Sequence, residues 1–178
     1  TFDLAAYVAN KENFFFRDAD GLNVTDGETE HMGVEAAFDL ELVPGRLAAR
    51  GSAAWSDQTY NFDRPANGIS DGNQIDTAPE WLADRALVWP PSDALEASFE
   101  AEHIGEYFTN PGNTADYPGH TVFHVRGAYA FDERLEAFLI VRNVFDLAYA
   151  DRADFGFGDD RYFPGEPLNA TVGVRKQF

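Results

Sequence analysis

Apolar and polar residues alternate along most of this chain, and the segment 168–178 shows the pattern most plainly. Its even positions are apolar except Lys176, and its odd positions are polar or small. Successive side chains of a strand point to opposite faces, so the pattern predicts a strand with one apolar face and one wet face. A soluble protein would leave this terminal strand as an open edge, whereas in a membrane barrel its apolar face meets lipid.

The same alternation predicts an all-β protein of about eight antiparallel strands. The expected strands are 1–16, 30–42, 47–58, 79–89, 94–108, 120–131, 135–149 and 168–178. Four glutamates share one face of the segment 94–108, and such a face cannot line a dry core. We therefore expect its opposite, apolar face to meet hydrocarbon.

In the segment 79–89, either face of the strand could be the lipid face. Each choice places one charge in lipid, because the odd face carries Arg85 and the even face carries Asp84. Trp81 and Trp89 lie on the odd face, roughly 26 Å apart along a strand, which is close to the height of the apolar band between two aromatic girdles. This spacing favours the odd face as the lipid face, although Arg85 then faces lipid, which is unfavourable for a charged side chain.

The connections between the expected strands alternate in length. Long polar segments lie at 17–28, 59–78, 109–119 and 150–167, and tight turns at 43–46, 90–93 and 132–134. Outer-membrane barrels place short turns at the periplasmic end and long loops at the extracellular end. A soluble β-sandwich has no reason to sort its loops in this way.

Composition excludes several other classes of protein. The chain has 178 residues, a net charge of -18 and no cysteine, so it offers no disulfide framework, and its acidic balance argues against nucleic acid as a partner. The sequence contains no run of about 18 apolar residues, so it does not predict a membrane-spanning helix. We find no nucleophile with a base, no glycine-rich phosphate loop and no catalytic pair of acids, and therefore expect no enzyme activity and no cofactor.

Candidate binding residues gather in the long polar segments. Aromatic side chains there could form a platform for a ligand or pack loop against loop, and the acids could bind a cation or remain solvated. His120 and His124 share a face but lie roughly 13 Å apart along a strand, too far apart for one metal ion. The candidates for ligand contact are Tyr60, Phe62, Asp151, Asp154, Phe155, Phe157, Asp159, Asp160 and Tyr162.

Two motifs near the end of the chain resemble a known family. Val141-Arg142-Asn143-Val144-Phe145-Asp146 is followed by Tyr149, and Tyr162-Phe163-Pro164-Gly165-Glu166-Pro167 precedes a strand that ends on Phe178. The chain thereby resembles the C-terminal barrel end of TonB-dependent outer-membrane receptors. One departure is Leu168, where the family often has Arg.

The resemblance implies a 22-stranded barrel around an N-terminal plug, with residues 1–178 forming roughly its last eight strands and no plug or earlier strands in this chain. It implies a bacterial outer-membrane transporter, most often for a ferric siderophore or other metal chelate. Its partners would be outer-membrane lipid and lipopolysaccharide, its own plug, and the TonB energy-coupling complex. Glu35, in its Gly-Val-Glu context, matches a position that contacts the plug.

The charged face gives independent support for a wide barrel. It carries about eight acids against about four arginines, and a closed barrel of eight strands is just wide enough to fill with side chains. Unpaired carboxylates in that space would be costly. Two alternatives remain at this point: a small, complete eight-stranded outer-membrane barrel with a structural or adhesive role, and a soluble acidic β-sandwich.

Overall fold

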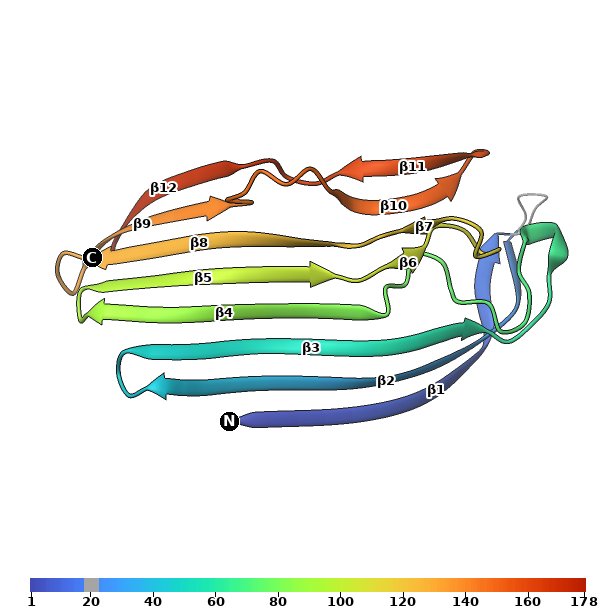
Figure 1. The fold of residues 1–178 in the computed structure, drawn as a ribbon, viewed down its shortest axis with the longest axis horizontal. Helices are drawn as coiled ribbons and strands as arrows, with labels where there is room; N and C mark the ends of the chain where they lie inside the picture. Colours follow the sequence, from blue (N-terminus) through green and yellow to red (C-terminus); the bar gives the residue numbers. More distant parts are fainter. Residues whose placement is uncertain (18–22) are drawn as a thin grey trace.

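A computed structural model describes residues 1–17 and 23–178, and its main feature is one antiparallel sheet of eight long strands (Figure 1). Their order in the sheet is β1-β2-β3-β4-β5-β8-β9-β12. The strands are β1 (Phe2–Arg17), β2 (Asn23–Val43), β3 (Leu47–Tyr60), β4 (Trp81–Ser92), β5 (Leu95–Ile104), β8 (His120–Ala130), β9 (Leu135–Arg142) and β12 (Asn169–Lys176). The all-β, antiparallel prediction is confirmed, and β1 and β12 are the two edges of the sheet.

Short turns lie at one end of this sheet and the larger connections at the other (Figure 1). The loop end also carries two small hairpins and a 3-10 turn. These are β6 (Tyr107–Phe108) with β7 (Asp116–Tyr117), β10 (Ala150–Gly156) with β11 (Asp159–Pro164), and η1 (Pro65–Asn67). Among the described residues, no helix has the length and apolar character needed to cross a membrane.

The strand register sorts the side chains into one apolar and one charged face. Leu87 on β4 pairs with Phe99 on β5, which pairs with Val125 on β8. Arg85 lies on the same face, because it pairs with Gly51 on one side and Ala101 on the other. The odd face of β4 is therefore the apolar face, as the tryptophan spacing predicts.

Packed apolar residues are few in the described part of the chain, and they lie mainly at the loop end. The buried hydrophobic side chains are Tyr60, Ile69, Tyr107, Tyr117, Val122, Ala150 and Ala153. Along the sheet, large apolar side chains such as Leu87, Phe99 and Leu139 remain more than a third exposed. This arrangement suits a sheet whose apolar face is covered by lipid rather than by protein.

Three expected loops are wrong in part, because the chain pairs with itself there. The segment 109–119 contains β7, which pairs with β6. The sequence predicts a loop over 17–28, but β2 begins at Asn23, and residues 18–22 lie outside the described part. Gly27 makes the pairing possible, since the ring of Phe14 occupies the place of its missing Cβ. The segment 150–167 contains the β10–β11 hairpin, whose turn residues Phe157 and Gly158 both have positive φ. Two such residues match the twist of a hairpin.

Three strands also end at other residues than the alternation of apolar and polar residues predicts. β4 runs through Pro90 and Pro91 to Ser92 with a register shift, because proline donates no ladder hydrogen bond. β5 ends at Ile104, after which the Gly105 N–H donates to the Trp81 carbonyl. β9 ends at Arg142 rather than at 149, because the next residue, Asn143, has φ 49° and turns the chain.

Candidate functional site

The predicted binding residues lie at the loop end, in two separate groups. Tyr60 and Phe62 form the first group together with two rings of β1. The Phe62 ring centre lies 5.8 Å from that of Tyr60, 6.2 Å from that of Phe14 and 5.6 Å from that of Phe16. These aromatic contacts therefore pack Phe62, in the connection after β3, against the far end of β1 and against Tyr60, which is 7% exposed.

A short hydrogen bond fixes Tyr60 within this group. Its hydroxyl donates to Oδ1 of Asp76 at 2.6 Å. Burial, together with the neighbouring Asp76 carboxylate, raises the pKa of Tyr60 far above its ordinary value. The phenol thus stays neutral and donates this hydrogen bond to Asp76 throughout the physiological pH range.

The second group lies on the β10–β11 hairpin, where the four predicted acids do not converge. Asp154 is 3% exposed and pairs with the Arg161 Nε at 2.7 Å and with Arg152. Asp151, Asp159 and Asp160 are exposed on the same hairpin. Within residues 1–17 and 23–178, no cluster of three or more His, Cys, Asp or Glu side chains could hold a metal ion.

The hairpin presents a surface of aromatic rings and guanidinium groups. The Arg161 guanidinium lies 5.3 Å from the centre of the Phe157 ring and 5.8 Å from that of Phe163. Phe157 is fully exposed, and Phe155 and Tyr162 are exposed to about half. We call Arg161, Phe155, Phe157, Tyr162 and Phe163 the hairpin surface.

Two buried tyrosines hold this hairpin against the β6–β7 loop. The hydroxyl of Tyr107 accepts the Ala153 N–H at 2.8 Å, and that of Tyr117 accepts the Ala150 N–H at 3.1 Å. The Phe155 N–H donates to the Thr109 carbonyl at 2.8 Å. The position of the hairpin surface therefore depends on contacts between distant parts of the chain. The two residues that each tyrosine hydrogen bond joins are 33 and 46 positions apart in the sequence.

A hollow of about 610 Å³ lies between the top of β8 and the base of the hairpin. The sequence did not single it out, because its walls come from segments far apart in the chain. The rings of His120 and Tyr149 are tilted at 40° to each other, with centres 4.4 Å apart, and the His120 Nδ1 shares a 2.9 Å hydrogen bond with the Tyr117 hydroxyl. Tyr162 also lines it. The hollow thus offers aromatic faces with a few polar groups, which is typical of small-molecule sites.

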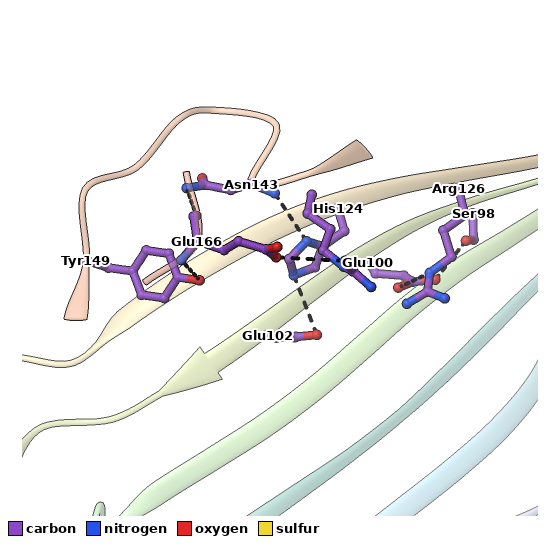
Figure 2. A network of polar contacts seen from close by, with 9 residues as sticks. Ser98, Glu100, Glu102, His124, Arg126, Asn143, Tyr149 and Glu166 are labelled. Carbon is purple, nitrogen blue, oxygen red and sulfur yellow. Dashed lines mark hydrogen bonds and ion pairs between the residues drawn. The ribbon is translucent and has the colours of Figure 1, made fainter. Parts of the chain in front are cut away.

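Asn143 anchors the base of the same region (Figure 2). It is 1% exposed, and its side-chain NH₂ donates to the carbonyls of Leu147 at 2.9 Å and Glu166 at 3.0 Å. Its Oδ1 accepts the Leu147 N–H at 2.9 Å. The motif around Asn143 therefore has a physical role: one amide joins the end of β9 to the segment that leads into β12.

His124 lies beneath Asn143, on the charged face of β8 (Figure 2). Its Nδ1 accepts the Asn143 N–H at 3.2 Å, and its Nε2 lies 3.5 Å from a Glu102 carboxylate oxygen. Because Nδ1 is the acceptor, the neutral ring carries its proton on Nε2, toward Glu102. His120 and His124 thus belong to different networks.

Some of the acids on the charged face of the sheet pair with arginines. The pairs are Asp39 with Arg50 at 3.0 Å, Glu100 with Arg126 at 2.9 Å and Glu136 with Arg175 at 3.1 Å. Glu35 is exposed on this face, and the ion pairs of the described residues do not include it.

An open sheet with one lipid-compatible face, one charged face and loops sorted by end defines part of the wall of an outer-membrane β-barrel. Residues 1–144 match the family model described as TonB dependent receptor-like, beta-barrel. The chain belongs to this family, whose members are outer-membrane receptors and transporters rather than enzymes.

Solved structures show the same fold. The ferric-catecholate import receptor Fiu from E. coli K12 is 20% identical, with a TM-score of 0.78 over 99% of this chain and 25% of that one. The ferric yersiniabactin uptake receptor FyuA from Yersinia pestis is 13% identical, with a TM-score of 0.82 over 99% and 27%. The copper transporter OprC is 19% identical, with a TM-score of 0.75 over 99% and 29%. None of the curated proteins compared with the sequence matches it. The chain thus spans about a quarter of the length of these structures.

Proposed function

We propose that this chain is the C-terminal wall of a TonB-dependent outer-membrane transporter that takes up a ferric siderophore or another metal chelate. The family membership supports this proposal, as do the names of the similar structures, which are import or uptake receptors for ferric chelates and a copper transporter. In the proposal, earlier strands complete a 22-stranded barrel in outer-membrane lipid and lipopolysaccharide. An N-terminal plug fills it and couples to the TonB complex, and Glu35 contacts the plug.

The observation that carries the proposal is the aromatic hollow beside the hairpin surface. Aromatic rings stack on planar groups of a chelate, and guanidinium groups pair with its carboxylate or phenolate oxygens. Phe155, Phe157 and Tyr162 are the exposed rings that would contact the ligand, and Asp151, Asp159 and Asp160 would tune its charge. Tyr60, Phe62 and Asp154 would shape the loops around it.

Growth on defined iron sources tests the proposal. Deletion of the full-length gene is expected to abolish growth of an iron-limited strain on one chelate of a panel and leave growth on the others unchanged. The double variant F157A/Y162A in the full-length receptor is expected to weaken binding of that chelate at least tenfold. The matched control F131A removes an exposed ring at the opposite end of the sheet and should bind normally. Unchanged growth of the deletion strain on every iron and copper chelate of the panel would overturn the proposal.

The second candidate, a closed eight-stranded barrel, is less well supported. A closed barrel needs β1 to pair with β12, and in the described residues these strands are the two edges of the sheet. Heat-modifiable migration and the mass of the complete gene product distinguish the two candidates, because the smaller barrel predicts a product close to the 19.8 kDa of this chain.

A further inference from the structure

Arg85 is an unusual residue on the apolar face, because it places a permanent charge near the middle of the membrane. It lies four residues from Trp81 and four from Trp89, or roughly 13 Å along the strand in each direction. An arginine on the lipid face of a barrel is destabilising, and the effect is largest at the bilayer midplane. The ion pairs of the described residues do not include Arg85, and its side chain is exposed.

Several small residues flank Arg85 on the apolar face. Its direct neighbours across the sheet are Gly51, which the ring of Phe38 partly covers, and Ala101. We call Arg85, Ala49, Gly51, Ala53, Ala83 and Ala101 the Arg85 patch. Larger apolar side chains such as Phe38, Leu87 and Phe99 surround it on the same face. Small residues let another membrane protein approach closely, as they do where transmembrane helices pack.

We propose that the Arg85 patch is a docking surface for another outer-membrane protein that presents a carboxylate at the same depth in the bilayer. Charge complementarity favours this partner, because a guanidinium pairs bidentately with a carboxylate and such a pair is strong where water is excluded. Between the levels of the two tryptophans, no described position on the apolar face is acidic. The same face of a second copy would thus bring Arg85 against Arg85.

The test uses the full-length receptor and three substitutions. In vesicles of zwitterionic phospholipid without other proteins, R85L is expected to lower the unfolding equilibrium constant at least tenfold, because it removes an unpaired charge from lipid. In mild detergent extracts of native outer membranes, the wild type is expected to migrate as a larger complex and R85L and R85E as the free receptor. F99L, an outward substitution beside the patch, is the matched control and should keep the complex.

Two further experiments identify the partner and the carboxylate that contacts Arg85. A photoreactive residue at Ala101 crosslinks the neighbour, and an acid-to-arginine change in that neighbour is expected to restore the complex with R85E. The proposal fails if the wild type migrates alone, if R85E keeps the complex, or if R85L loses bound lipopolysaccharide phosphate instead of a protein, which would make Arg85 a lipid contact. Because none of these readouts depends on chelate uptake, they are independent of the proposed transport function.

Discussion

At the scale of single residues, Asn143 shows how one side chain can end a strand and begin a connection. A positive φ is uncommon outside glycine, and asparagine tolerates it better than most residues because its short amide bonds to the local backbone. Here that amide is buried and all of its hydrogen bonds go to main-chain groups of 147 and 166. The conformation and the bonds therefore support each other.

We expect Asn143→Ala to destabilise the full-length barrel by about 2–4 kcal/mol, because it removes three part-buried hydrogen bonds, two of them to the carbonyls of Leu147 and Glu166. Asn143→Gly loses the same bonds but relieves the positive φ, so its loss should be smaller. Urea unfolding in lipid vesicles, followed by tryptophan fluorescence, measures both. Equal loss in the two variants would show that backbone conformation contributes nothing.

Tyr60 leads to a prediction about pH. Its pKa is raised, chiefly by burial and then by Asp76, so the folded state favours the neutral phenol. The stabilisation is therefore fully present below the ordinary pKa of 10.0 and is lost as pH rises toward the folded value. We expect Tyr60→Phe to cost about 1–3 kcal/mol at pH 7, since it deletes a bond to a charged acceptor. Stability curves of both proteins from pH 7 to 11 should converge only above pH 10, and convergence below pH 9 would contradict this assignment.

At the scale of elements, the β10–β11 hairpin depends on its neighbours. Isolated two-stranded hairpins are marginally stable in water. Tyr107 and Tyr117 supply the missing stability by accepting two of its backbone N–H groups, and Ala153 is fully buried in the same apolar cluster. The ligand surface that we propose is therefore only as ordered as this contact.

We expect the double variant Tyr107→Phe and Tyr117→Phe to loosen this hairpin without unfolding the sheet. Amide exchange at 150–156 should accelerate roughly 5- to 30-fold, which corresponds to about 1–2 kcal/mol for two lost hydrogen bonds. Exchange in β8 and β9 should stay unchanged. Tyr162→Phe serves as the control, because that ring is exposed, and acceleration in the control would show that the effect is not specific to the two buried hydroxyls.

The elements also show what the sequence could and could not predict. Alternation found all eight long strands and the phase of β4, because each face of a membrane strand meets a different solvent. It missed the β10–β11 hairpin, since acids and glycines in 150–160 look like a solvated loop and only tertiary contacts make them pair. It also extended β9 past Asn143, because apolar periodicity carries no information about a positive φ. The hollow near His120 could not be predicted, since it depends on how three connections pack.

At the scale of the whole molecule, the two faces of the sheet carry the functional argument. The charged face combines three arginine-carboxylate pairs with exposed acids such as Glu35. Among the described residues, the apolar face carries one charge near mid-depth, Arg85. A wall of this kind separates hydrocarbon from a wet or protein-filled interior, so side-chain environment should change abruptly from one residue to the next.

Single spin labels measure that change directly in the full-length receptor in lipid vesicles. Labels at Leu87, Phe99, Val125 and Leu139 should collide with dissolved oxygen and be shielded from a water-soluble nickel complex, because they face lipid. Labels at Ser98 and Arg126 should be shielded from oxygen at the same depth. The chain has no native cysteine, so each introduced thiol in this segment reports one position. Equal oxygen accessibility at Val125 and Arg126 would mean that both faces of β8 have the same surroundings, and a membrane-spanning wall could not produce that result.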